Sequence, residues 1–187
     1  MSPLLVTVDT GPWIDLLNQS GSEMERILWW HRSGYIRLFA SSRVFDPDTD
    51  SMDPHQQIQL RSILRTAGVE IVGAGFRTGI SRIMGPDVIE SSKGVRSDDD
   101  WKRFTEIVGP DPSALPPNNI GRAMKRKVGD YDALYMHFGL GFDVFLTLDT
   151  KDYLHISRRG RYGREINLII QAPCEFISTY TTVFSTL

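Results

Sequence analysis

The chain has 187 residues, of which 41% are hydrophobic and 24% are charged, and its formal net charge at pH 7 is -2. These values are typical of one globular domain and exclude a disordered or fibrous chain. The single cysteine, Cys174, excludes a disulfide framework and a multi-cysteine metal site, so we expect a reducing cytoplasmic setting. No stretch approaches the roughly 20 apolar residues of a membrane span, so we expect no membrane partner.

The first part of the chain alternates between strand and helix patterns. Hydrophobic period and turn residues predict, in order, strand 4–8, helices 13–17 and 23–31, strand 36–40, helix 55–67 and strand 69–72. Gly68 supplies a natural helix stop between the last two elements. Because helix and strand follow one another repeatedly, the pattern favours a parallel sheet in an α/β domain.

The second part is less regular and begins with a segment that we leave unassigned, 74–119, inside a single domain 1–187. Within that segment only 98–108 has a helical pattern. Beyond it the sequence predicts helix 120–140 with a break at Gly129, strand 144–148, a helical turn after Asp149 and strand 166–171. The stretch 155–164 reads as flexible and basic.

Two predicted strands end in an aspartate. Strand 4–8 is followed by Asp9, and the other strand delivers Asp149. Ligands of open α/β sheets bind at the carboxyl ends of the strands, so distant parts of the chain are expected to assemble one acidic site there. Converging carboxylates usually hold a hard divalent cation.

Four segments together resemble a PIN domain. They are the opening stretch from Val8 to Leu17, the helical Asp132-Ala133-Leu134, the stretch from Phe145 to Asp152, and the ending from Ile170 to Phe176 with its Pro-x-x-Phe. The resemblance covers roughly 1–72 and 120–178.

The resemblance implies a three-layer α/β/α fold with a mainly parallel sheet of about five strands. It also implies hydrolysis of RNA phosphodiesters with Mg²⁺ or Mn²⁺, because two closely spaced cations activate water and stabilise the leaving oxygen. The implied catalytic and metal-binding residues are Asp9, Asp46, Asp132 and Asp149, with Asp152 as a further metal ligand and Thr10 and Thr147 as supporting residues. RNA is the implied substrate, and members of the family form homodimers or, as toxins, bind an antitoxin.

Several of these assignments have alternatives. Asp9 is also suited to cap a helix, and Asp152 could cap the helix that follows it. Asp130 and Asp132 lie about 200° apart around a helix, so only one of them can face a common site. The fourth carboxylate is the least defined, because the acidic segment offers several competitors to Asp46, namely Asp48, Asp50 and Asp53.

The basic stretch beyond the last acidic motif is a candidate RNA contact. Arginines match the geometry of phosphates, and an exposed tyrosine can stack on a base. The residues assigned to nucleic-acid binding are Arg158, Arg159, Arg161, Tyr162 and Arg164. The alternative is a solvated loop.

Two other functions remain open on the sequence. One is a PIN-like module that binds RNA or protein without cleaving, and the other is an acidic-site phosphohydrolase that acts on small phosphate esters. The glycines of 73–79 depart from the spacing of a dinucleotide loop, so we expect no nucleotide cofactor.

Overall fold

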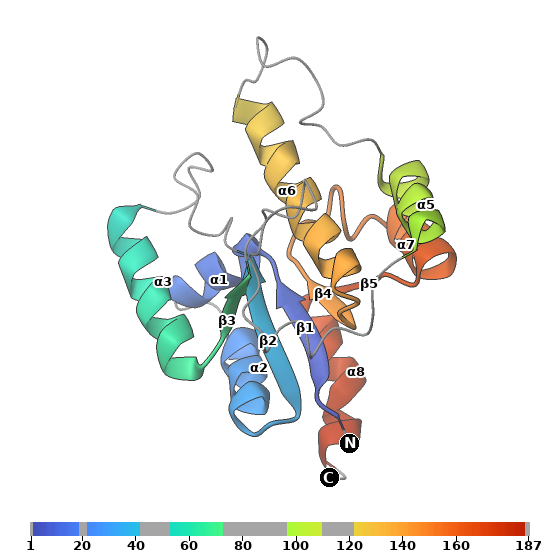
Figure 1. Ribbon diagram of the computed structural model, residues 1–187. Coiled ribbons are helices and arrows are strands. Elements are labelled where there is room, and N and C mark those ends of the chain that lie inside the picture. Colours follow the sequence, from blue (N-terminus) through green and yellow to red (C-terminus); the bar gives the residue numbers. More distant parts are fainter. Residues whose placement is uncertain (1, 19–21, 42–52, 73–96, 110–121, 186–187) are drawn as a thin grey trace.

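One parallel sheet organises the computed structural model, which describes residues 2–18, 22–41, 53–72, 97–109 and 122–185 (Figure 1). Within these residues, five strands pair in the order β3-β2-β1-β4-β5. The strands are β1 Leu4–Val8, β2 Ile36–Ser41, β3 Glu70–Val72, β4 Val144–Leu146 and β5 Ile169–Gln171.

Helices cover both faces of this sheet. The described helices are α1 Thr10–Leu17, α2 Ser22–Arg32, α3 Pro54–Ala67, α5 Asp98–Val108, α6 Arg122–Gly139, α7 Ile156–Ile166 and α8 Pro173–Ser185. None of the helices formed by the described residues is long and apolar enough to span a membrane.

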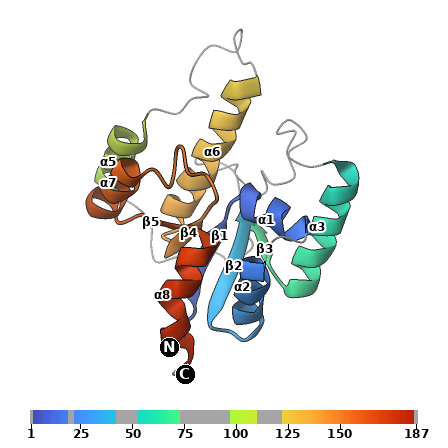
Figure 2. The same cartoon turned by 180° about the vertical axis from the view of Figure 1, so that it is seen from behind.

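The side chains of the central strand, β1, separate the two helical layers. Val6 and Val8 are buried among residues of α1, α2, α3 and α8. Leu5 points to the opposite face, where α6 packs, and α5 and α7 join α6 on that face. Figure 1 shows α6 in front of the sheet, and Figure 2, seen from behind, brings α8 to the front. The predicted three-layer α/β/α fold with five parallel strands is therefore confirmed.

Most of the predicted elements are present with boundaries shifted by a few residues. The helix predicted over 55–67 is α3, which begins with a capping box between Asp53 and Gln56 and ends at Gly68 in the left-handed conformation. The break predicted at Gly129 is absent, because α6 continues through that residue. A glycine inside a helix costs about 1 kcal/mol, which the packing of a long helix against a sheet readily offsets.

The end of the chain differs more from the sequence prediction. The stretch predicted to be flexible, 155–164, is largely helical and belongs to α7. Gly160 and Gly163 weaken the helical signal in the sequence, but Tyr162 and Ile166 are buried on one face of α7 and hold it against its neighbours. The last strand is also shorter than 166–171, because Asn167 ends α7 in the left-handed conformation and β5 begins two residues later.

Glu175 joins three elements at the carboxyl end of β5. One carboxylate oxygen, Oε1, accepts a hydrogen bond from Arg159 Nη1 of α7 at 2.8 Å, and Oε2 accepts from the backbone nitrogen of Ala172 at 2.9 Å. The Arg159 hydrogen bond is the main cause that lowers the pKa of Glu175 from its ordinary value of 4.5. Glu175 therefore helps to fix α7 against the start of α8.

This arrangement predicts a pH-dependent contribution to stability. Because the folded-state pKa is lowered, the stabilisation is present above about pH 4.5 and is lost as the pH falls through the folded pKa. Glu175→Ala should lower the free energy of unfolding by about 1 kcal/mol at pH 7, an estimate discounted for the exposure of the pair. Urea titrations of wild type and variant between pH 3 and 7 measure this difference, and a difference that stays constant with pH would contradict the assignment.

Candidate active site

The carboxyl ends of β1 and β4 lie side by side at the point where the strand order changes direction. From β1 the chain continues to β2 on one side, whereas from β4 it continues to β5 on the other. Val8 and Leu146 are register partners, and the backbone nitrogen of Asp9 donates to the oxygen of Leu146 at 2.9 Å. In open α/β sheets the crevice at such a switch point is the usual ligand site. The topology therefore selects this edge independently of any sequence motif.

Thr147 connects the two strand-end aspartates. Its hydroxyl donates to Asp9 Oδ2 at 2.8 Å and accepts from the backbone nitrogen of Asp149 at 3.1 Å. Thr147 is fully buried, while both aspartates are partly exposed. A side chain locked in the core thus fixes the carboxylate of Asp9 and the backbone of Asp149, two residues that reach solvent.

Each aspartate is also held by its own local backbone. Asp9 caps α1, because its Oδ1 accepts from the nitrogen of Thr10 at 2.7 Å, so Thr10 supports the site through its backbone. Asp149 Oδ1 accepts from the nitrogens of Lys151 and Asp152 at 2.9 and 3.0 Å. The capping alternative for Asp9 is therefore correct, and it coexists with the contact to Thr147.

Replacing Thr147 by valine should destabilise the protein. Valine keeps the shape of the side chain but removes the donor to Asp9 and the acceptor for the backbone of Asp149. Loss of buried hydrogen bonds of this kind costs about 1–3 kcal/mol in the free energy of unfolding. Thr147→Ser, which keeps the hydroxyl, is the matched control in urea denaturation. Equal stability of the valine and serine variants would show that the hydroxyl does not hold this edge.

Tyr153 is a member of this site that the sequence did not single out. It is 5% exposed, and its ring makes an edge contact with Phe145 of β4. Burial raises the pKa of Tyr153 well above its ordinary value, and the charges of Asp130, Asp9 and Asp149 raise it further. The charges of carboxylates from three separate parts of the chain therefore act on the same phenol. The only sequence signal was an aromatic residue soon after the acidic motif.

The two acids of α6 occupy different faces of that helix. His137 of α6 forms a buried hydrogen bond of 2.9 Å with Thr7 of β1, so the face that carries His137 looks onto the sheet centre. Asp130 lies two turns earlier on that face. Asp132 shares a face with Met136, which packs with Leu5 of β1 and with β2 and β3 residues.

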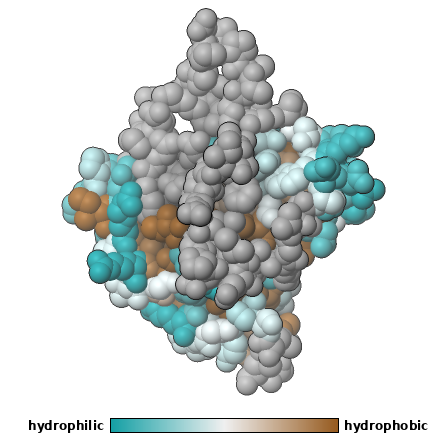
Figure 3. Space-filling view, viewed as in Figure 1, coloured by the Kyte–Doolittle hydropathy of each residue, from teal (hydrophilic) through white to brown (hydrophobic). Residues whose placement is uncertain are grey.

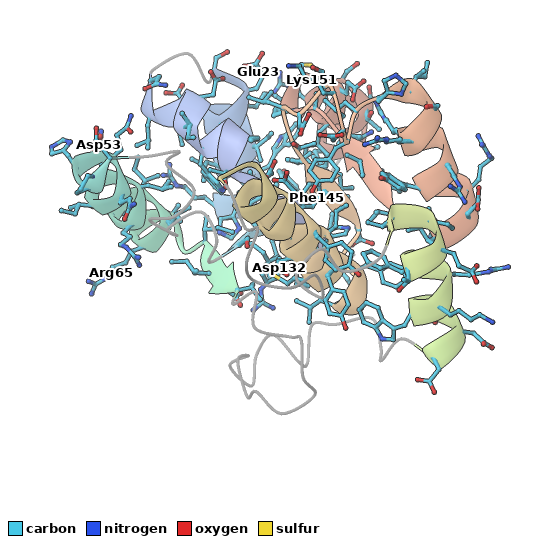
Figure 4. All side chains as sticks on the ribbon, turned by 90° about the horizontal axis from the view of Figure 1, so that it is seen from above. Glu23, Asp53, Arg65, Asp132, Phe145 and Lys151 are labelled. Carbon is cyan, nitrogen blue, oxygen red and sulfur yellow. The ribbon has the colours of Figure 1, made fainter. Side chains whose placement is uncertain are left out.

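The burial of the two acids differs as well. Asp132 is 2% exposed, whereas Asp130 is partly exposed. Figure 4 shows Asp132 and Lys151, the latter on the loop after β4, on opposite sides of α6. Asp130 is thus the α6 carboxylate whose charge acts on Tyr153 together with those of Asp9 and Asp149, while Asp132 lies on the helix face of Met136, and the role of Asp132 as a metal ligand stays a prediction.

The remaining predicted ligands are distributed as follows. Asp46 lies outside the described residues, as do its competitors Asp48 and Asp50, while Asp53 caps α3. Asp152 is exposed and forms an ion pair with Arg158. Residues 73–79, which we compared with a dinucleotide loop, also lie outside the described part.

The predicted RNA-binding residues all lie on α7, in two environments. Three arginines form ion pairs, Arg158 with Asp152, Arg159 with Glu175 and Arg161 with Glu165. Arg164 is exposed. Tyr162 is 6% exposed and belongs to the buried cluster shared with α5 and α6, so its ring is not presented to solvent as base stacking requires.

The donor set at this edge has the chemistry that a hard divalent cation prefers. Carboxylate oxygens are the usual ligands of Mg²⁺, which typically takes one or two of them beside water and phosphate. In the part of the chain that the structure describes, no three acidic, histidine or cysteine side chains are grouped closely enough to hold a metal ion. The described residues therefore bring carboxylates of the right chemistry to this edge without forming a three-residue metal group, and the acidic segment 42–52 lies outside the described part.

Comparisons with other proteins give little further information. No protein-family model matches the chain, and its sequence is not similar to that of any curated protein. A similar solved structure is the crystal structure of VapBC2 from Rickettsia felis bound to a DNA fragment from their promoter. The two chains are 13% identical, with a TM-score of 0.48, and the similarity covers 90% of this chain and 98% of that one.

Proposed function

We propose that the protein is a divalent-metal-dependent ribonuclease whose active site lies at the carboxyl ends of β1 and β4. The observation that carries this proposal is the link from Asp9 through Thr147 to Asp149 at the switch point of the sheet. The sequence resemblance to PIN domains supports RNA as the substrate. The single cysteine favours the cytoplasm as the compartment.

In this proposal Asp9 and Asp149 would bind the Mg²⁺ or Mn²⁺ together with one carboxylate of α6, that of Asp132 or Asp130, and Asp46 would be the fourth ligand. A bound cation would activate the attacking water and stabilise the leaving oxygen. Thr147 would hold Asp9 and Asp149 in place, and the buried Tyr153 would limit the access of bulk water to them.

A second candidate function is a PIN-like module that binds RNA or a protein without cleaving. The absence of a three-residue metal grouping among the described side chains favours it. An antitoxin or a second copy of the chain, both implied by the family resemblance, would be its natural protein partners. Hydrolysis of small phosphate esters is the third possibility, and activity on a generic ester without activity on RNA would support it.

Calorimetric titration with Mn²⁺ tests the proposal directly. We expect wild type to bind Mn²⁺ at a specific site and to hydrolyse single-stranded RNA only when the ion is present. Asp130→Asn and Asp132→Asn, titrated in parallel, identify the α6 carboxylate that binds the ion, since loss of a ligand or of a supporting carboxylate typically weakens binding by about 10–100-fold. A protein that binds RNA but no Mn²⁺ would favour the binding module.

A further inference from the structure

We propose that Arg158 is the arginine that receives an RNA phosphate beside the acidic edge, and that Asp152 is its resident counter-ion. In the free protein Asp152 would hold the guanidinium in place until a substrate phosphate takes over. This inference rests on the proposed function, because it concerns substrate recognition at the same site. It assigns different roles to arginines that the sequence cannot distinguish.

The position of the Asp152–Arg158 pair supports this role. Arg158 Nη1 lies 2.6 Å from Asp152 Oδ1, and the backbone nitrogen of Asp152 donates to Asp149 Oδ1 at 3.0 Å. The guanidinium of Arg158 therefore contacts Asp152, and Asp152 is in turn hydrogen-bonded to the carboxylate of Asp149. In Figure 3 the edge of the molecule formed by α5 and α7 is mostly hydrophilic, as expected for a surface that meets a polar ligand.

Arg158 also lies on the face of α7 that carries the buried Tyr162, because it precedes that residue by four positions. Burial raises the pKa of Tyr162, while the charges of Arg158 and Arg161 lower it and that of Asp152 raises it. The Asp152–Arg158 pair therefore lies at the end of α7 that is electrostatically coupled to the buried cluster.

The other paired arginines of α7 have structural partners. Arg159 binds Glu175, which also caps α8, so removing Arg159 from this contact would loosen the junction described above. Arg161 pairs with Glu165 one turn later on its own helix. Arg158 is the arginine among these three whose partner, Asp152, is hydrogen-bonded to Asp149.

Because the Asp152–Arg158 pair is exposed, a phosphate can replace Asp152 as the partner of Arg158 at a small cost in free energy. The side chains of Arg158 and Asp152 are 54% and 60% exposed. Exposed ion pairs contribute about 0–1 kcal/mol, so little is lost when the pair opens. A phosphate accepts two parallel hydrogen bonds from a guanidinium and carries more charge than one carboxylate oxygen.

This inference changes the role of Asp152. As a counter-ion, Asp152 competes with the substrate, so removing its charge should strengthen RNA binding. As a metal ligand, which is the role implied by the family resemblance, the same change should weaken Mn²⁺ binding instead. The two roles therefore predict opposite results for one substitution.

The test measures RNA binding in EDTA, so that neither metal nor cleavage is needed. Fluorescence anisotropy with a labelled single-stranded RNA compares wild type, Arg158→Gln, Asp152→Asn and the double variant at several salt concentrations. Arg158→Gln should weaken binding about tenfold and reduce the slope of log K against log salt by about 1. Asp152→Asn should strengthen binding about threefold, and it should have no effect in the Arg158→Gln background.

Two charge-matched controls accompany these variants. Arg65→Gln removes a positive charge from α3, which Figure 4 shows on the far side of the molecule from Lys151. Glu25→Gln removes a negative charge from the exposed surface of α2, which packs on the face of the sheet opposite to α7. Both should change RNA affinity by less than about twofold, since exposed charges at a distance are screened by salt.

Several outcomes would overturn the inference. They are equal effects of Arg158→Gln and Arg65→Gln, weaker binding by Asp152→Asn, a loss of Mn²⁺ affinity in Asp152→Asn, and no RNA binding by any variant. Failure of the proposed function would look different. Wild type would then bind RNA with the expected dependence on Arg158 and Asp152 but would not cleave it when Mn²⁺ is added.

Discussion

Replacement of Asp9 by asparagine will reduce metal-dependent RNA cleavage by about 100-fold or more, because each 1.36 kcal/mol of lost transition-state stabilisation costs a factor of ten and a bound cation supplies several kcal/mol. Asparagine keeps the size of the side chain and an oxygen that can cap α1. The fold should therefore persist, with a melting temperature a few degrees below that of wild type, because the hydrogen bond from Thr147 to Asp9 Oδ2 is lost. Single-turnover cleavage of a short RNA with saturating Mn²⁺ gives the rate, and circular dichroism gives the melting temperature.

Asp149→Asn should have an effect of the same order, because Thr147 joins the backbone of Asp149 to the carboxylate of Asp9 at the same sheet edge. Asp143→Asn is an informative control. Asp143 lies at the opposite end of β4, where it accepts a hydrogen bond from the backbone of Leu5. Cleavage by Asp9→Asn and Asp149→Asn at the wild-type rate would exclude this edge as the active site, whatever activity the protein retains.

Truncation of Phe104 to alanine should cause a large loss of stability. Phe104 is fully buried, and its ring stacks on Phe138 of α6 at 4.8 Å between centroids and makes edge contacts with Trp101, Tyr131 and Tyr135. Removing a buried phenylalanine side chain costs about 3–5 kcal/mol. Urea denaturation of Phe104→Ala against wild type measures this cost. The change should also loosen α7, because α5 packs against it.

A surface substitution on the same helix separates packing from helix propensity. Arg103 is exposed on α5, so Arg103→Ala should change the free energy of unfolding by no more than about 0.5 kcal/mol. If Phe104→Ala and Arg103→Ala were equally mild, α5 would be only loosely attached to α6, and the aromatic cluster would not stabilise the domain.

The sequence predicted those features that depend on short segments. Strand 4–8 and its terminal Asp9 follow from a β-branched apolar run that ends in a polar turn, and Asp149 follows from the same pattern. Alternating helices and strands were sufficient to predict a parallel sheet. Thr147 was recognised as a support because it lies two residues before Asp149, and its hydrogen bonds confirm the contact.

Features that depend on packing between distant segments were not predictable in this way. The flexible interpretation of 155–164 is wrong because two glycines lower helix propensity locally, whereas the burial of Tyr162 stabilises the helix globally. The sequence offered Asp130 and Asp132 as alternatives, and only the contacts of α6 in the fold, His137 with Thr7 and Met136 with Leu5, show on which helical face each acid lies. The role of Asp46 stays a prediction, since it lies outside the described residues.

The hydrogen bond between Thr147 and Asp9 joins residues 138 positions apart in the sequence. A ribosome releases Asp9 early, but Thr147 is added only 138 residues later, and contacts of such long range form late in folding. A nascent chain that ends before Thr147 would therefore contain one half of the candidate site without the other. The nuclease proposed above would stay inert on the ribosome until the strand before Thr147 has emerged.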